Sequence, residues 1–254
     1  FSATLDRDVD SLVKKYLRNP VTHALANEKK TSGNMTHHVL ILEQANKDAI
    51  TASIAARKGK SIFFVRTKHG ADKLAKRMNE SGVAVGALHG GKTQAQRSRV
   101  LEGFKSGKTN ALVATDVAAR GIHVDDVSLV VHVDAPENHK DYLHRAGRTA
   151  RAGAVGTVVT LATHKQLKSV RGLAARAGVK LIETKVAPMD KNLVQITGAI
   201  EPSGVPIVVA EGGKKEGSGR SGRSRGGYRD SRSRGGGKKK KSRPRPSERR
   251  KRPR

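Results

Sequence analysis

Six short apolar runs, rich in β-branched and aromatic residues, alternate with helical patterns from residue 38 onward. The clearest helical pattern spaces Ala71, Leu74, Ala75 and Met78 by three and four residues, and Gly82 follows it as a stop signal. Strands that alternate with crossover helices predict one α/β domain, in which a mostly parallel sheet is covered by helices on both faces. The predicted strands are residues 39–42, 62–65, 83–88, 111–114, 129–133 and 155–161.

Segments with weaker patterns flank this domain. Apolar residues repeat with helical spacing over residues 7–17 and predict an amphipathic helix, which a polar linker follows. The apolar runs at 194–196 and 205–209 do not fit the alternating pattern. We divide the chain into an N-terminal segment, a linker, the α/β domain, an extension of undetermined role and a tail, at residues 1–25, 26–37, 38–185, 186–210 and 211–254.

The tail is dominated by Gly, Ser, Arg, Lys and Pro. It holds 19 basic and 4 acidic residues, and thus +15 of the formal net charge of +29. Such a segment cannot bury enough apolar surface to fold, so we expect it to be disordered. Its charge indicates a polyanionic partner such as a nucleic acid.

Composition also excludes several classes of protein. The chain has no cysteine, which excludes a disulfide scaffold and a cysteine-based zinc site. No apolar run approaches the roughly 18 residues of a transmembrane helix, so we expect no membrane partner. The first residues show neither an initiator Met nor a signal peptide. We therefore expect a cytoplasmic protein of which this chain is one part.

Small, hydroxyl and cationic residues follow three of the predicted strands. In an open parallel sheet, ligands bind at the carboxyl ends of the strands. Each position also has an ordinary alternative, since a Thr or Asp can cap a helix, glycines can form a turn, and Gln94 and Arg97 can lie on a solvated helix face. Together they favour a binding site. The candidates are Arg66, Thr67, His89, Gly90, Gly91, Gln94, Arg97, Thr115, Asp116, Ala118, Ala119, Arg120 and Gly121.

Residues 144–151, His-Arg-Ala-Gly-Arg-Thr-Ala-Arg, form the most basic segment of the domain. On a helix, His144, Arg148 and Arg151 would share one face at spacings of four and three. Neighbouring cations repel unless an anion lies opposite them, and the planar guanidinium group can hold phosphate oxygens bidentately. The segment therefore predicts a phosphate clamp, with a solvated basic face as the open alternative.

In order along the chain, four segments resemble motifs of the second RecA-like lobe of DEAD-box ATP-dependent RNA helicases, of the bacterial type. These segments are residues 62–67, 94–97, 114–121 and 144–151, and Ser2-Ala3-Thr4 is similar to the motif that ends the first lobe. The resemblance covers residues 1 to about 180 and implies a RecA-like α/β fold. The phosphate loop and the Asp-Glu-Ala-Asp motif do not occur in these 254 residues. The resemblance thus implies that ATP with Mg²⁺ is held mainly by an upstream lobe.

The resemblance also implies roles for individual residues. Arg148 and Arg151 would act as arginine fingers on the γ-phosphate of ATP, with Gly121 close to the nucleotide. RNA phosphates and sugars would be held, without base reading, by Thr67, Gly90, Arg97 and Thr115. Coupling to the upstream lobe would use Ser2, Thr4, Gln94, Arg120, His144 and Arg145.

The sequence departs from the family pattern at three positions. His123 stands where an Asp usually contacts the nucleotide ribose, and a histidine accepts a hydrogen bond only through the unprotonated nitrogen of its neutral ring. Gly91 stands where Asp is common, and Ala150 stands where Gly is common.

By resemblance, the chain is the C-terminal part of an ATP-dependent RNA helicase that remodels short RNA duplexes, inactive as an ATPase by itself. Two Arg-Gly-Gly repeats in the tail, at 225–227 and 234–236, would hold RNA nonspecifically. One alternative is a non-enzymatic RNA-annealing or assembly module that acts through the tail, and a solubility tail is another reading of that segment. A DNA translocase of the same superfamily is disfavoured by the His-Arg start of residues 144–151.

Overall fold

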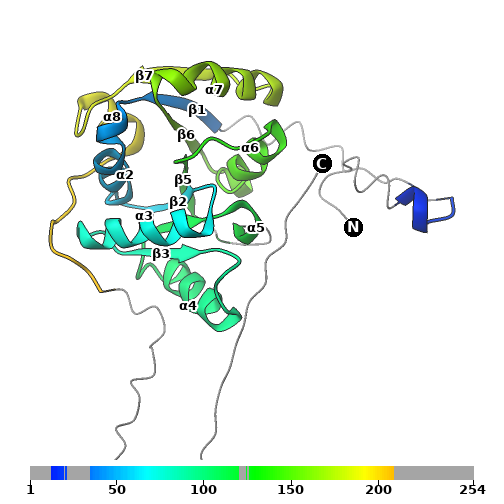
Figure 1. Cartoon of the computed structure of the whole chain (residues 1–254), viewed down its shortest axis with the longest axis horizontal. Helices are drawn as coiled ribbons and strands as arrows, with labels where there is room; N and C mark the ends of the chain where they lie inside the picture. The colour runs from blue at the N-terminus through cyan, green and yellow to red at the C-terminus, as the bar shows by residue number, and fades with distance from the viewer. Residues whose placement is uncertain (1–12, 20, 22–34, 120–123, 125, 209–254) are drawn as a thin grey trace, which may run out of the picture. The chain divides into compact units, whose positions relative to one another are not determined.

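The computed structural model describes residues 13–19, 21, 35–119, 124 and 126–208 (Figure 1). Residues 13–16 are helical, within the helix predicted for 7–17. Several predictions fall outside the described residues: those for Ser2, Thr4, Arg120, Gly121, His123, most of the linker, and the tail.

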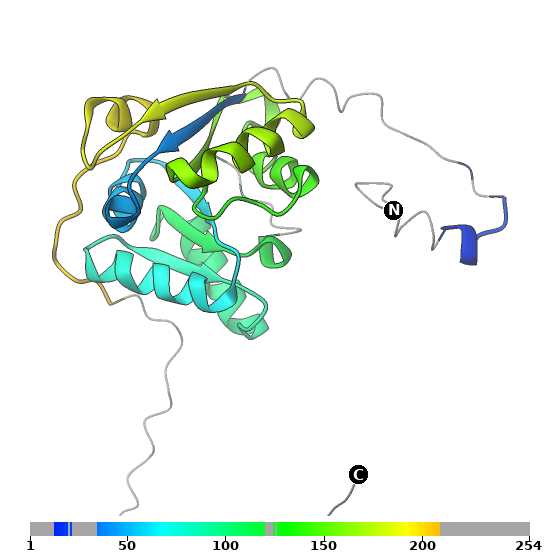
Figure 2. The same ribbon diagram turned by 45° about the horizontal axis from the view of Figure 1, so that its top comes forward.

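Seven strands form one sheet in which every pairing is parallel. All six predicted runs are strands, and the seventh lies at the sheet edge beside the first (Figure 2). The strands are β1 (Met35–Ile41), β2 (Lys60–Phe64), β3 (Val85–Leu88), β4 (Ala111–Ala114), β5 (Val127–His132), β6 (Gly156–Ala162) and β7 (Leu181–Lys185), in the order β3-β4-β2-β5-β6-β1-β7.

Helices cover both faces of the sheet, as predicted. One face carries α2 (Lys47–Ala55), α3 (Lys68–Glu80) and α8 (Lys191–Thr197). The other face carries α4 (Gln94–Lys105), α5 (Asp116–Ala119), α6 (His139–Ala146) and α7 (His164–Ala177). Two short 3₁₀ turns, η2 (Gln44–Asn46) and η3 (Arg151–Gly153), complete the described elements. The chain is therefore an α/β protein with a parallel sheet between two helical layers.

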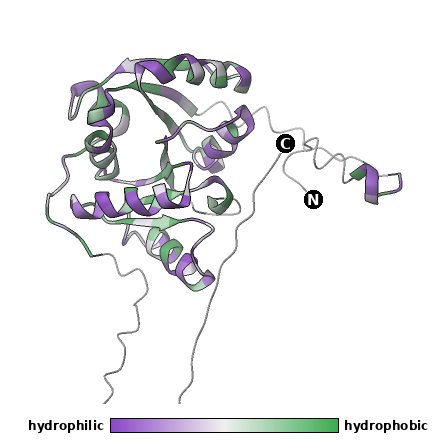
Figure 3. Ribbon diagram, viewed as in Figure 1, coloured by the Kyte–Doolittle hydropathy of each residue, from purple (hydrophilic) through white to green (hydrophobic). Residues whose placement is uncertain are grey.

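Apart from the edge strand β7, the strands contain continuous apolar runs because both of their faces are buried. In β2, Phe63 packs against the α2–α3 layer, while Ile62 and Phe64 pack against the α4–α6 layer. The hydrophobic colouring of the strands in Figure 3 follows this double burial. Each fully buried large side chain stabilises the fold by about 1.5–3 kcal/mol, so the two clusters hold the sheet and both helical layers as one body.

Hydroxyl and amide side chains fix the starts of three helices. Thr67 caps α3 by accepting a hydrogen bond from the Gly70 N–H (3.0 Å). Thr93 forms a capping box with Gln96 at the start of α4, and Asn138 caps α6. Such caps contribute about 1 kcal/mol each and define where each helix leaves its strand.

The extension that the sequence left unassigned is part of the folded lobe. Leu193 of α8 and Ala199 are buried in the core. The chain then runs past the ends of α2 and α3, where the Ile200 N–H donates to Ser53 O (3.0 Å) and the Gly204 N–H donates to Ser81 O (3.0 Å). A Cβ on Gly82 would come within 2.0 Å of the Ser203 hydroxyl, so the predicted helix stop also makes room for the extension.

Within the described ranges, no helix is both long and apolar enough to cross a lipid bilayer.

Two histidines and a tyrosine form a polar cluster inside the sheet core. His132 is fully buried and its Nδ1 lies 3.1 Å from the Thr160 hydroxyl, while His37 Nδ1 lies 3.0 Å from the Tyr142 hydroxyl. In the described part of the chain, His132 Nε2 has no hydrogen-bond partner. Burial lowers the pKa of both histidines; for His132, the nearby charges of Arg145 and His37 lower it further.

We expect the free energy of unfolding to fall as the pH drops below about 6.5, because the unfolded chain then binds protons that the folded chain resists. The loss should reach about 1.4 kcal/mol per pH unit for each such histidine. Urea denaturation between pH 8 and pH 5.5 measures it. His132→Phe should make the pH dependence shallower, and an unchanged slope would show that other groups cause it.

Candidate functional site

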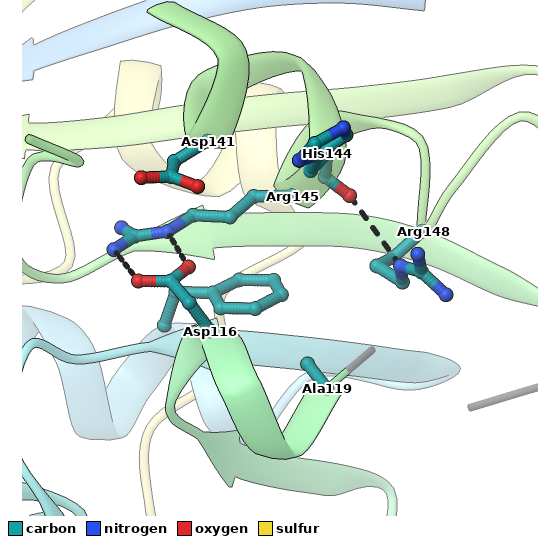
Figure 4. Close-up of a pocket in the computed structure, with 7 residues that line it drawn as sticks. Asp116, Ala119, Asp141, His144, Arg145 and Arg148 are labelled. Atoms are coloured by element: carbon teal, nitrogen blue, oxygen red, sulfur yellow. Dashed lines mark hydrogen bonds and ion pairs between the residues drawn. The ribbon is translucent and has the colours of Figure 1, made fainter. Parts of the chain in front are cut away.

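A buried arginine joins two helices that carry predicted site residues. Arg145 of α6 is 2% exposed. Its Nε and one terminal nitrogen donate to the two carboxylate oxygens of Asp116 at the start of α5 (2.5 and 2.7 Å; Figure 4). Its other terminal nitrogen donates to Asp134 O (2.7 Å), and its guanidinium group lies 5.2 Å from the centre of the Phe64 ring. The bidentate pair therefore fixes α6 against α5 and the end of β5.

A small pocket surrounds this ion pair. Figure 4 shows Asp116 and Ala119 on α5 and Asp141 and His144 on α6. Arg148 lies at one end of this pocket and donates from Nε to the His144 carbonyl (3.4 Å). The fold thus brings the segments 114–119 and 144–148 together, although they are far apart in the sequence. The expected contact of His144 and Arg145 with an upstream lobe stays a prediction, and within this lobe Arg145 has an internal structural role.

The prediction that His144, Arg148 and Arg151 share one helical face is wrong. Helix α6 ends at Ala146, and η3 starts at Arg151. Between them Ala150 takes a left-handed conformation (φ 54°, ψ 38°), which interrupts the helix. The buried Thr149 hydroxyl donates to the Val127 carbonyl and so draws this turn against the start of β5. A helical wheel cannot reveal this contact, because Val127 is 22 residues away.

The two arginines nevertheless lie close together, around the turn instead of along a helix. Arg151 Nε donates to the Gly147 carbonyl (3.1 Å). Burial lowers the pKa of the Arg148 guanidinium, and the charge of Arg151 lowers it further. Both side chains line a second pocket, which also contains Asp126 and Ser128 at the start of β5. Two positive charges held this close repel each other, and a phosphate group bound between them would relieve that repulsion.

The residues predicted to contact the RNA backbone lie at the carboxyl edge of the sheet, as expected for residues that follow parallel strands. Thr67 and Gly90 are exposed after β2 and β3, and Thr115 is half-buried after β4. Arg97 of α4 donates to the Ala118 carbonyl of α5 (3.4 Å), and Gln94 is exposed at the start of α4. Arg148 and Arg151 follow the last turn of α6 and line a pocket at the start of β5. Arg148 also lines the pocket around Asp116, so it connects the two parts of the site.

Asp134 is a site residue that the sequence reasoning missed. Its carboxylate accepts the Arg66 N–H (3.0 Å) and pairs with Lys47 (3.4 Å), while its carbonyl accepts Arg145. It thereby links the residues after β1, β2 and β5. Its position directly after a predicted strand, like that of Asp116, was the available signal.

A second missed contact shapes the turn after β3. His89 is buried, its Nδ1 accepts the Gly91 N–H (3.1 Å), and its Nε2 lies 2.9 Å from Asp72. Although burial raises the pKa of Asp72, hydrogen bonds from His89 and Lys92 outweigh it and leave the pKa below its usual value. A Cβ on Gly91 would lie 3.1 Å from His89 Nδ1, which favours glycine at this departure from the family pattern. Among the described residues, no three His, Asp or Glu side chains are grouped so that they could hold a metal ion.

Comparison with known proteins identifies the family. The family model described as the helicase conserved C-terminal domain matches residues 45–153. The structure of the E. coli DEAD-box protein SrmB bound to regulator of ribonuclease activity A is 32% identical, and the match covers 61% of this chain and 96% of that chain with a TM-score of 0.53. The chain belongs to the DEAD-box RNA helicase family.

Other DEAD-box relatives are longer than this chain. DEAD-box ATP-dependent RNA helicase 9 of rice is 39% identical over 188 residues, which are 72% of this chain and 30% of the relative. S. cerevisiae Dbp5 bound to RNA and ADP BeF3 is 26% identical, with a TM-score of 0.66 over 78% of this chain and 54% of that chain. The chain thus spans about 30% of the length of the rice relative. It carries the C-terminal domain of a DEAD-box helicase, and the bacterial type stays a prediction.

Asp116→Ala should lower the free energy of unfolding by about 3 kcal/mol, because it leaves the Arg145 guanidinium buried without its carboxylate. Chemical denaturation of the full chain measures the change. Glu183→Gln is the control, since it breaks a bidentate pair with Arg171 that lies on the surface, and its effect should be much smaller. Equal losses would contradict a special role for the buried pair.

Ala150→Gly should raise the free energy of unfolding by up to about 1 kcal/mol, because glycine adopts the left-handed conformation without the Cβ clash. The same substitution at Ala175, which is exposed within α7, should lower it by about 1 kcal/mol. Denaturation midpoints of the two variants should therefore move in opposite directions. A destabilised Ala150→Gly variant would contradict the left-handed turn.

Proposed function

We propose that this DEAD-box domain works in an RNA-stimulated ATPase that remodels short RNA duplexes, with ATP and Mg²⁺ held mainly by an upstream lobe. The observation that carries the proposal is the pair Arg148 and Arg151, which two backbone carbonyls hold around one turn beside a pocket. In this role their guanidinium groups neutralise charge that develops on the transferred γ-phosphoryl group.

The surroundings of the two arginines favour this role because they are already ordered. Thr149 anchors the turn to β5, and Arg145 anchors the preceding helix to Asp116. A Cβ on Gly156 would come within 2.5 Å of the Thr149 hydroxyl, so the start of β6 also packs closely against the turn. Donors that are fixed before the reaction need no reorganisation when charge develops, which is where electrostatic catalysis gains most.

The carboxyl edge of the sheet supports RNA as the partner. Thr67, Gly90, Arg97 and Thr115 offer hydroxyl, backbone and guanidinium donors suited to phosphates and sugars. Phe63, Phe64, Phe104 and Tyr142 are all buried, so these rings cannot stack on bases. Binding through such groups is nonspecific in sequence. The structure of the relative Dbp5 contains RNA and ADP BeF3, which supports RNA and an adenine nucleotide as ligands of the protein to which this domain belongs.

The Arg145–Asp116 pair provides a route by which RNA binding would affect ATP hydrolysis. Thr115, a proposed RNA contact, precedes Asp116 directly, and Arg145 lies three residues before Arg148. A displacement of the segment after β4 would therefore pass through the buried Asp116–Arg145 contact to the last turn of α6. From there it would reach the turn of residues 147–151, which carries Arg148 and Arg151 and is called the arginine turn.

The tail favours a second candidate function. Its charge of +15 suits RNA annealing or assembly that needs no hydrolysis, with the folded lobe as a passive platform.

The arginine role predicts a selective loss of catalysis. In the protein that joins this lobe to an ATP-binding lobe, Arg148→Ala or Arg151→Ala should lower kcat about 10³-fold, as for other arginine fingers. RNA affinity without nucleotide, measured by fluorescence anisotropy, should stay unchanged. The 254-residue chain alone should not hydrolyse ATP. Surviving hydrolysis with weakened RNA binding would show that residues 144–151 are an RNA patch.

The tail predicts a change in salt dependence. If about six tail cations engage phosphates, truncation after Ala210 should flatten the plot of log K against log salt by about 4 units, since each phosphate of a single strand contributes about 0.7. Affinity at low salt should fall equally for all RNA sequences. An unchanged slope would assign the tail to spacing or solubility and would refute the annealing candidate.

A further inference from the structure

Helix α7, the longest in the described part of the chain, carries a basic face without acidic residues. Its 14 residues include Lys165, Lys168, Arg171 and Arg176, all exposed, and no Asp or Glu. Helical spacing places these four cations on one side, opposite the buried Val170 and Leu173. The hydrophilic colouring along α7 in Figure 3 follows this division.

Three of these cations have no carboxylate partner among the described residues. Arg171 is held bidentately by Glu183 of β7 (2.5 and 2.6 Å). Across the described ranges, no ion pair joins Lys165, Lys168 or Arg176 to an acid. Helix α3 differs, since its Lys76 pairs with Glu80 and its Arg77 pairs with Asp48.

The arrangement is unfavourable for a helix that meets only water. Lys165 lies in the first turn, where the helix dipole disfavours a cation and no acidic residue offsets it. Lys165 and Lys168 form a like-charge pair at a spacing of three residues, and so do Lys168 and Arg171. A polyanion bound along the face would reverse both effects.

We propose that Lys165, Lys168 and Arg176 form a second surface for the RNA phosphate backbone, separate from the contacts at the strand ends. This inference rests on RNA as the partner in the proposed function. Helix α7 packs on β1 and β6, whereas Thr67, Gly90 and Thr115 follow β2, β3 and β4. In the sheet order, β6 lies two strands from β2, or about 10 Å.

The dimensions of the face suit a nucleic-acid strand. Lys165 and Arg176 are separated by about 17 Å along the helix axis, which is enough to follow several successive phosphates. The face presents no Phe, Tyr or Trp side chain, and its cations suit phosphate oxygens, so we expect it to hold the backbone without reading bases. An RNA that extends beyond the strand-end contacts would thus gain affinity from α7, whereas an RNA too short to reach α7 would not.

The test compares two triple variants of the full chain with the same loss of charge. One carries Lys165→Gln, Lys168→Gln and Arg176→Gln. The control carries Lys58→Gln, Lys105→Gln and Lys108→Gln, whose lysines are exposed near the ends of α2 and α4. Fluorescence anisotropy with a single-stranded RNA of about 30 nucleotides, at several salt concentrations, gives log K against log salt.

The α7 variant should bind about tenfold or more weakly, and its plot should be flatter by about 2 units, as three lost phosphate contacts predict. The control should stay close to the unmodified chain. The melting temperature of the α7 variant should not fall, because the substitutions relieve repulsion, and this separates lost binding from lost folding. Equal effects in the two variants would overturn the proposal, because net charge alone would explain them. If the unmodified chain binds no RNA, the proposed function itself is wrong.

Discussion

The ion pair between Arg145 and Asp116 is the contact on which the candidate site depends. A buried guanidinium group is costly unless its donors are matched, and here the carboxylate of Asp116 and the carbonyl of Asp134 match them. The same group lies over the Phe64 ring. One side chain thus contacts four parts of the chain, namely the ends of β2 and β5 and the helices α5 and α6. Together with the Thr149–Val127 hydrogen bond, it holds the segment after β4 and the turn of residues 147–151 in place.

The two parts of the site are connected by the last turn of the short helix α6 and the turn that follows it. Helix α6 has eight residues and thus a length of about 12 Å. Asn138 caps its first turn near the carboxyl edge of the sheet, and Thr149 ties the turn beyond its last residue to β5. This short element is therefore anchored at both of its ends.

The sequence was sufficient to predict the sheet, because strands buried on both faces must be apolar throughout. It missed β7, an edge strand in which Glu183, Thr184 and Lys185 interrupt any apolar run. It also misjudged the arginine segment, since the left-handed Ala150 and the Thr149–Val127 bond are set by tertiary packing. The internal role of Arg145 depends on Asp116, which is 29 residues away. Motif spacing selected candidate residues but could not predict the contacts that arrange them.

The path of the extension bears on where this domain can be cut. The family match ends at residue 153, and the alternation of strands and helices ends near residue 185. Leu193 and Ala199 nevertheless belong to the same apolar cluster as Ile54 and Met78. A fragment trimmed to the motif boundaries would therefore expose part of that cluster to water, which favours aggregation. The folding unit is longer than the segment that carries the family motifs, and fragments for crystallisation or binding assays should extend through Val208.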